Sequence, residues 1–399
     1  MAEVQGFSSE QFAPLKKLIA EKLAADEELG ISIVINKDGK NIVDLWGGYS
    51  DEAKTKPWDT NAITNVWSST KTVAAFATLL CHERGLLSVD EPVAKYWPEF
   101  AENGKEGILV RHVLSHTSGV SGWETKVSPE ESADIAYSTP LLAKQAPWWE
   151  PGTASGYHMF CYGHLLGEIV RRVSGKPMKE FVATEIAGPL GADFQVGALE
   201  KDWPRVSMVI PPPPSQVDFS KIPPDSPAGK TFPNPPLDPL VPAKDWWRKA
   251  DVSGANGHTN ARGINAILSI ISNGGKDANG KQWLSQSTID TIFRQQSNGP
   301  DYIVGIPINF GIGYGISGPA TSQGVPWIPQ GKVCFWGGYG GSWEVMDCDR
   351  KVTFTYVMNK MGEGVLGNSR TVEYVNLVWT ILQQAENKVP ADGSELPVV

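Results

Sequence analysis

The pattern of apolar and polar positions predicts strands at both ends of the chain and helices between them. Two short apolar runs flank the turn Asp38-Gly39, and three more follow one another near the end of the chain. The predicted strands are Ile31 to Ile35, Asn41 to Trp46, Lys332 to Trp336, Ser342 to Asp347 and Val352 to Met358. Segments 9–25 and 369–386 predict terminal helices. We therefore expect one antiparallel sheet, built from both ends of the chain and covered by these helices.

The middle of the chain is predicted to be mostly helical, with one long interruption. The predicted helices are residues 70–87, 109–116, 131–144, 157–174, 177–185 and, beyond the interruption, 259–272. From Pro204 to Pro242 there are 13 prolines in 39 residues, which excludes a regular helix or a central strand. A loop of this length in a compact domain is usually functional or disordered. Two interpretations stay open: a flap that covers a pocket, and an inert surface excursion.

Composition excludes some classes of partner. The 399 residues are 41% hydrophobic and 20% charged, as in ordinary globular proteins, and the net charge of −9 argues against nucleic acid or an anionic membrane as a partner. Residues 1–7 lack the pattern of a signal peptide, the apolar runs are shorter than a membrane span, and no Asn-X-Ser/Thr sequence occurs. We therefore expect a cytoplasmic protein.

Cysteine and histidine give no sign of a disulfide framework or a metal site. The cysteines show no Cys-X-X-Cys spacing and lie in apolar surroundings, which favours free buried thiols. They are Cys81, Cys161, Cys334 and Cys348. His112 and His116 are four residues apart, but no carboxylate lies suitably near them, so both are interpreted as structural. We expect neither a metal nor a cofactor.

The stretch Ser68-Ser69-Thr70-Lys71, which leads into a long apolar helix, is the strongest chemical signal. A serine hydroxyl is a weak nucleophile at neutral pH and needs a base beside it. On a helix, Lys71 lies one turn beyond Ser68 on the same face, within reach of its hydroxyl. The helix N-terminus also favours an oxyanion there. A lysine at the start of a buried helix is costly unless it has a partner or a function.

Two further stretches carry candidate groups. Trp148 and Trp149 precede a Pro-Gly turn, after which Tyr157 is predicted to open a helix. A nearby lysine cation would favour its phenolate, which would then relay a proton. In the glycine-rich stretch 335–343, the amide of Tyr339 would complete an oxyanion hole with that of Ser68. A packed core tyrosine and a glycine-rich turn are the respective alternatives.

Taken together, these three stretches resemble the serine β-lactamase and penicillin-binding-protein superfamily. The match is closest to its class C-like branch, which includes family VIII carboxylesterases and fungal polyketide acyltransferases. Additional similar stretches are Gly85 to Val93, Val110 to Gly119 and Asn256 to Thr259. The resemblance implies an α/β part from residues 1–61 and 250–399. A helical part, 62–249, would be inserted between them and would include the proline-rich loop 204–242. The active site would lie in the cleft between the two parts.

The resemblance also assigns roles by position. Ser68 matches the family's nucleophile, Lys71 its base partner and Tyr157 the tyrosine of its Tyr-X-Asn motif. The oxyanion hole would be formed by the amides of Ser68 and Tyr339. Expected substrate-binding residues are Trp148, Met159, Trp336, Gly337, Gly338, Tyr339 and Trp343.

Two positions depart from the lactamase pattern. Met159 stands where the family has the Asn of Tyr-X-Asn, and Trp336 where it has the Lys of Lys-Thr-Gly. In a lactamase those polar groups hold the β-lactam amide and carboxylate. Their replacement by apolar side chains resembles the esterase and acyltransferase branch, so we expect efficient ester cleavage and slow lactam hydrolysis.

The expected function is that of a serine hydrolase, a carboxylesterase that acts on small apolar esters through an acyl-enzyme. One alternative is an acyltransferase that moves the acyl group to a natural-product alcohol. A second is an amidase or D-amino-acid peptidase, and a third is an inactive binding protein on the same scaffold. The expected partners are a small-molecule ester and, for the transferase, an alcohol acyl acceptor.

Overall fold

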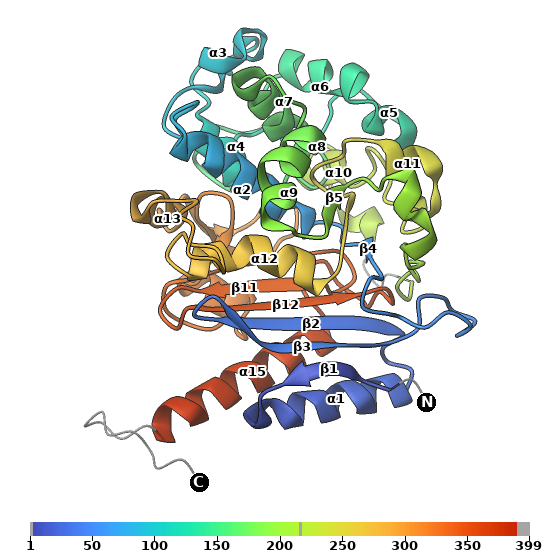
Figure 1. Ribbon diagram of the computed structural model, residues 1–399. Coiled ribbons are helices and arrows are strands. Elements are labelled where there is room, and N and C mark those ends of the chain that lie inside the picture. Colours follow the sequence, from blue (N-terminus) through green and yellow to red (C-terminus); the bar gives the residue numbers. More distant parts are fainter. Residues whose placement is uncertain (1–2, 215–217, 389–399) are drawn as a thin grey trace.

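A nine-stranded antiparallel sheet lies at the centre of the computed structural model, which describes residues 3–214 and 218–388 (Figure 1). Its strand order is β1-β3-β2-β12-β11-β10-β9-β8-β7. The strands are β1 (Gln5–Ser8), β2 (Gly30–Lys37), β3 (Lys40–Gly48), β7 (Ser297–Pro300), β8 (Pro307–Phe310), β9 (Gly315–Ile316), β10 (Val333–Gly337), β11 (Trp343–Asp347) and β12 (Val352–Met358). Because β2 pairs with β12, the predicted sheet built from both ends of the chain is confirmed.

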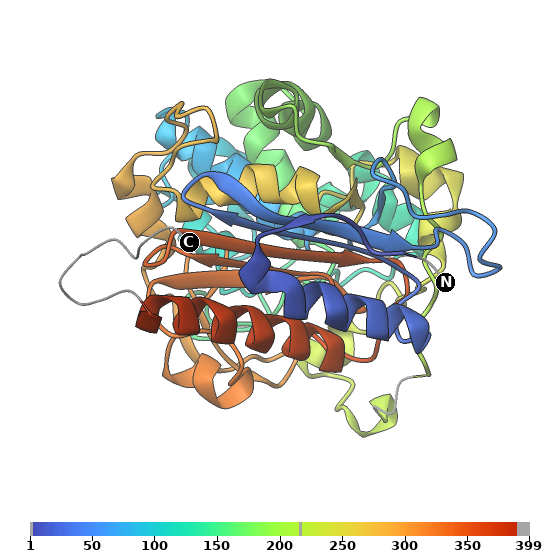
Figure 2. The same ribbon diagram turned by 60° about the horizontal axis from the view of Figure 1, so that its bottom comes forward.

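Helices cover both faces of this sheet. The terminal helices α1 (Ala13–Ala24) and α15 (Ser369–Lys388) lie side by side on one face, as Figure 2 shows, and α12 (Ala261–Ser272) packs on the other. The central strands β2 and β12 are therefore buried on both sides, which explains why their sequences are nearly continuous apolar runs.

Most of the remaining helices form a layer above α12, while α14 packs against β8 of the sheet (Figure 1). Those that the sequence predicted are shorter than expected. They are α2 (Thr70–Glu83), α3 (Val93–Tyr96), α4 (Val110–Leu114), α5 (Pro129–Ala133), α6 (Ile135–Lys144), α7 (Tyr162–Ser174), α8 (Met178–Phe181), α9 (Gly188–Leu190), α10 (Pro227–Thr231), α11 (Asp245–Lys249), α13 (Gln286–Ile292) and α14 (Pro319–Gly324). A π-helical turn occupies Val182–Ala187, and 3₁₀ turns occupy Glu10–Phe12, Pro98–Ala101, Glu200–Arg205, Phe219–Lys221 and Val241–Ala243.

Two predicted helices differ in a way that matters for the site. The predicted helix 157–174 begins only at Tyr162, so Tyr157 lies in the loop before α7 and does not open a helix. The predicted helix 131–144 is two helices, because Asp134 is extended and caps α6 through its carboxylate.

The helical layer and the sheet meet around α2. This helix is buried on all sides over its first three turns, with α7 packed against it in the helical layer and α12 on the side of the sheet. A small second sheet, β4 (Thr64–Asn65), β6 (Gly257–Thr259) and β5 (Phe194–Val196), lies beside the start of α2. Within the part of the chain that the structure describes, no helix is long and apolar enough to cross a membrane.

Candidate active site

Ser68 projects from a strained turn at the start of α2. Ser69 is the residue that caps this helix, so Ser68 precedes the first helical turn. Trp67, just before it, has a left-handed backbone with φ of 48°, a conformation that costs a bulky L-residue about 1–3 kcal/mol. The Trp67 ring packs against Trp247 and Tyr339, with ring centroids 5.9 and 5.8 Å away. This packing holds the turn that presents Ser68.

Lys71 is positioned to accept the proton of Ser68. Its Nζ lies 3.1 Å from the Oγ of Ser68 and donates to the carbonyl oxygens of Met159 and Gly254, each at 2.7 Å. The side chain is 2% exposed, and burial lowers its pKa from 10.5 to about 7. When the amine is neutral, the two carbonyls take its two protons, and its lone pair is left for the hydroxyl of Ser68. Lys71 can therefore act as a general base near neutral pH.

Tyr157 lies on the other side of Ser68. Its hydroxyl accepts a 3.3 Å hydrogen bond from the indole N–H of Trp336 and makes a hydrogen bond with Ser68, while its ring lies 5.0 Å from the Nζ of Lys71. Burial raises the pKa of Tyr157 above its ordinary value of 10, so the hydroxyl is a neutral phenol. The predicted phenolate is contradicted, because burial disfavours the charged forms of both Tyr157 and Lys71.

The amide groups of Ser68 and Tyr339 are free to bind an oxyanion. Within residues 3–214 and 218–388, neither amide donates a hydrogen bond to a protein acceptor. The close approach of the two segments depends on glycine. A Cβ on Gly338 would lie 2.2 Å from the carbonyl oxygen of Val66, and one on Gly337 would lie 2.1 Å from the ring of Trp343. Gly338 thus lets the end of β10 lie against the turn that carries Ser68, and Gly337 leaves room for Trp343 of β11.

A narrow apolar cavity opens beside Ser68. Its volume is about 30 Å³, which is room for one or two water molecules. The residues that line it are Trp67, Ser68, Tyr157, Met159, Phe160, Leu237, Ala255, Val304, Tyr339 and Val365, none of which is charged. A larger cavity of about 650 Å³ lies beside α1 and contains none of the predicted site residues.

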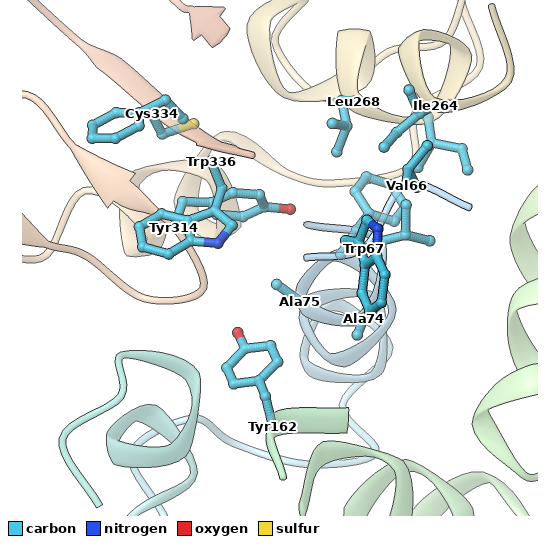
Figure 3. Packing of buried hydrophobic residues seen from close by; sticks show 14 of the residues in the cluster. Val66, Trp67, Ala74, Ala75, Tyr162, Ile264, Leu268, Tyr314, Cys334 and Trp336 are labelled. Atoms are coloured by element: carbon cyan, nitrogen blue, oxygen red, sulfur yellow. The ribbon is translucent and has the colours of Figure 1, made fainter. Parts of the chain in front are cut away.

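The structure brings some predicted substrate-binding residues to this cavity and places others elsewhere. Met159 and Tyr339 line it, while Trp336 lies behind Tyr157. Figure 3 shows Trp336 and Tyr314 on the side of the sheet, and Ala74 and Ala75 on α2. Trp343 is fully buried, with its ring centroid 5.8 Å from that of Phe335.

The tryptophans before the Pro-Gly turn lie away from the cavity. Trp148 donates its indole N–H to Glu124 and stacks under Lys230. Trp149 packs against Gly156, where an added Cβ would lie 2.3 Å from the indole. Trp149 therefore supports the loop that precedes Tyr157, and neither tryptophan lines the cavity.

Sequence reasoning missed the residues that close the cavity. Leu237 comes from the proline-rich segment, Val304 from the loop between β7 and β8, and Val365 from the loop before α15. The proline-rich segment is held by Asn234, whose side chain bonds the backbone of residues 123, 125 and 127. Of the two interpretations of this segment, the structure favours a cover over the pocket.

The other predicted groups are structural. His116 has a left-handed backbone, its Nδ1 accepts the amide N–H of His158, and its ring packs 4.9 Å from that of Tyr157. The cysteines are free thiols. Among the described residues, no group of three or more His, Cys, Asp or Glu side chains could hold a metal ion.

Comparison with known proteins places the whole site within one family. The sequence profile of the beta-lactamase family matches residues 15–376. The esterase/beta-lactamase LipL of Mycobacterium tuberculosis (strain ATCC 25618 / H37Rv) is 28% identical over 368 residues, which cover 90% of this chain and 83% of LipL.

Two solved structures share the fold over nearly the whole chain. A family VIII carboxylesterase has a TM-score of 0.86 and 30% identity and covers 95% of this chain and 100% of its own. A penicillin-binding-protein homologue from Caulobacter crescentus has a TM-score of 0.82 and 29% identity, with coverage of 95% and 99%. The predicted β-lactamase-like fold is therefore confirmed.

Proposed function

This chain belongs to the beta-lactamase family and is a serine hydrolase, and we propose that it cleaves esters of short, apolar carboxylic acids through an acyl-enzyme on Ser68. The observation that carries the proposal is the uncharged cavity of about 30 Å³, which opens beside the hydroxyl of Ser68 and in front of a lysine that is half neutral near pH 7.

In the first half of the reaction, the Oγ of Ser68 attacks the ester carbonyl carbon while its proton passes to the Nζ of Lys71. The carbonyl oxygen becomes an oxyanion, which the amides of Ser68 and Tyr339 stabilise. When the tetrahedral intermediate collapses, the ester C–O bond breaks and the alkoxide takes a proton from the hydroxyl of Tyr157. The protonated Lys71 then returns a proton to the Tyr157 oxygen through the entering water, and the acyl group stays on Ser68.

In the second half, water or an alcohol attacks the acyl carbon. Its proton passes to the neutral amine of Lys71, and the Oγ of Ser68 leaves and is reprotonated by that lysine. Hydrolysis and acyl transfer share every protein group in this step and differ only in the attacking molecule. The acyl acceptor is therefore a matter for experiment, and the test below includes competing alcohols.

The uncharged cavity disfavours substrates that carry a carboxylate. A penicillin or cephalosporin carries a carboxylate next to its lactam, but the cavity is lined by apolar and aromatic side chains. Burying an unpaired carboxylate costs several kcal/mol, whereas each buried methylene of a neutral acyl group gains about 0.8 kcal/mol. Neutral esters are thus favoured over β-lactams.

A panel of p-nitrophenyl esters of increasing acyl length, assayed with and without added alcohols, tests the proposal. We expect kcat/KM to rise from acetyl for as long as the cavity accepts further methylenes and to fall beyond that length. Cephalosporins should be hydrolysed with a kcat/KM below that of the best neutral ester. A cephalosporin that exceeds every neutral ester would overturn the proposal, and an ester product in place of the free acid would identify a transferase.

A further inference from the structure

One carboxyl group joins two walls of the cavity that are far apart in the sequence. The Oδ1 of Asp301 accepts the amide N–H of Tyr157 at 3.0 Å, and it also accepts the amides of Ile303 and Val304, at 2.9 and 3.1 Å. Tyr157 and Val304 both line the cavity. A single oxygen atom therefore fixes the backbone of the candidate acid and that of one cavity wall.

The burial of this carboxyl is unusual for a residue that only shapes a turn. Asp301 is 1% exposed, and its Oδ2 is also buried and lacks a partner at hydrogen-bonding geometry. Burial raises the pKa of Asp301, while the three amides and the side chain of Ser155 act to lower it. A half-paired buried carboxyl is costly, so its place beside the cavity requires a gain elsewhere.

Asp277 provides a comparison within the same chain. Its Oδ1 accepts the amides of Asn279 and Lys281, at 2.9 and 3.0 Å, and its Oδ2 accepts the indole N–H of Trp283 at 2.9 Å. Asp277 thus shapes a loop between α12 and α13 with both oxygens paired and without contact to the cavity. What distinguishes Asp301 is its bond to the chain segment of Tyr157.

We propose that Asp301 is a positioning residue that aligns Tyr157 with Ser68 and fixes Val304 as a wall of the acyl cavity. The inference rests on the proposed ester cleavage at Ser68. If Asp301 sets both positions, its loss should lower kcat and weaken acyl selectivity together. A residue that only shapes a loop would lower stability and leave both quantities unchanged.

Three variants separate these roles. Asp301→Ala removes all three accepted hydrogen bonds, whereas Asp301→Asn keeps a carbonyl oxygen at the same place. Asp301→Ser keeps a hydroxyl that can cap its own loop but does not reach the amide of Tyr157, and it preserves the loop if the Ala variant fails to fold. Asp277→Ala is the matched control, and each variant is assayed for kcat, KM, melting temperature and the ratio of kcat/KM for acetyl and butyryl esters.

We expect kcat to fall at least about tenfold in the Ala and Ser variants, because small displacements of catalytic groups are costly, and the acyl ratio to move towards one. The Asn variant should stay within about threefold of the parent, since its oxygen still accepts the amides. Asp277→Ala should lower the melting temperature and leave the acyl ratio unchanged.

An Asp301→Ser variant with the parent's kcat and acyl ratio would overturn the inference, and so would an Asn variant as impaired as the Ala variant. Labelling of Ser68 by a phosphonate probe is followed in parallel. If the parent protein is not labelled at Ser68, the proposed function itself fails. Labelling of the parent together with unchanged selectivity in the variants rejects only the role of Asp301.

Discussion

Arg370 and Lys71 are both buried cationic side chains, and they differ in whether an anion accompanies them. Arg370 of α15 is 5% exposed and bonds the carboxylate of Glu28 at 2.7 Å. Burial by itself would lower the pKa of Arg370, but its electrostatic partners, Tyr356 and Glu28 among them, hold it above its ordinary value. Lys71 is 2% exposed and, among the described residues, bonds no carboxylate, so burial lowers its pKa to about 7.

The difference shows how one fold uses buried charge in two ways. The Arg370 pair keeps its charges and ties α15 to the sheet, where Tyr356 of β12 also donates to Glu28. Lys71 has only carbonyl oxygens and the hydroxyl of Ser68 around its nitrogen, so it gives up its proton easily. The absence of a counter-charge is not enough for catalysis, because the buried amine of Lys105 also bonds carbonyl oxygens and has a pKa lowered to about 8. Lys71 differs in that its amine also faces the hydroxyl of Ser68, which places it for proton transfer.

Removing the hydroxyl of Ser68, from which Lys71 is proposed to take a proton, should have the largest effect on kcat/KM. Ser68→Ala is expected to lower kcat/KM by at least about 10³-fold, as in other serine hydrolases that lose their nucleophile. Ser69→Ala is the matched control, because Ser69 bonds the hydroxyl of Ser342 at 3.1 Å and not the substrate. Mass spectrometry should find a phosphonate adduct on Ser68, and an adduct on Ser69 or Ser342 would disprove the assignment.

Removing the base and the acid tests whether the two groups act as one unit. Lys71→Met and Tyr157→Phe should each lower kcat/KM by about 10²-fold or more, the usual contribution of general acid–base catalysis. Because the proton that Lys71 takes from Ser68 replaces the one that Tyr157 gives to the leaving alcohol, the double variant should be about as slow as the slower single variant. Losses that add up would mean independent roles for Lys71 and Tyr157.

Part of the candidate site could be predicted because two of its groups are close in the sequence. Ser68 and Lys71 lie within four residues, so their contact follows from helical geometry alone. The central strands were also predictable, since burial on both faces leaves mostly apolar and β-branched residues in β2 and β12. The edge strands β7 to β9 are short and rich in glycine and proline, so they carry no such signal.

The cavity walls were not predictable, because only the folded chain brings them together. Leu237, Val304 and Val365 are isolated apolar residues in three separate loops. Trp343 illustrates the opposite error. It follows the glycines at the edge of the site, but it is paired with Gly337 across the ladder and its ring lies in the core. Proximity in sequence to a site residue does not specify the direction of a side chain.

Breaking the buried ion pair between Arg370 and Glu28 should lower the free energy of unfolding and leave kcat/KM unchanged. Arg370→Met leaves the carboxylate of Glu28 buried without its cation, which is expected to cost about 3–5 kcal/mol of unfolding free energy. Replacing both residues, as Glu28→Leu with Arg370→Met, should recover much of this loss. Denaturant unfolding measures the effect, and the kcat/KM of the folded fraction should stay at the parent value. A large fall in this kcat/KM would mean that the ion pair of Arg370 also contributes to catalysis, as Lys71 is proposed to do.

The pH dependence of the reaction tests the state of Lys71 directly. The base must be neutral, so kcat/KM should rise with pH through about 7 and fall tenfold per unit below it. The same pKa shift makes the folding stability depend on pH in the same direction. Between about pH 7 and 10.5 the unfolded chain binds a proton at Lys71 that the folded chain does not, so this group makes stability rise with pH. An acidic limb near pH 9 or above would show that Lys71 keeps its proton.

Opening the cavity should produce the smallest effect. It tests whether the exclusion of water from the cavity keeps the pKa of Lys71 low, in contrast to that of Arg370. Leu237→Ala removes an apolar wall of the space beside Ser68, so one further methylene of the acyl chain should be accommodated. Each buried methylene is worth about 0.8 kcal/mol, which corresponds to about a fourfold gain in kcat/KM for the ester one carbon longer than the parent's best substrate.

The same substitution lets water approach Ser68 and Lys71, and better solvation favours the protonated amine. The acidic limb of the pH profile should therefore move to higher pH in the Leu237→Ala variant. Leu240→Ala is the matched control, because Leu240 lies on the same segment, is 51% exposed and does not line the cavity. If both variants shifted the profile and the acyl preference alike, a general loosening of the segment would explain the result. If only Leu237→Ala does so, the low pKa of Lys71 depends on the apolar cover over the cavity.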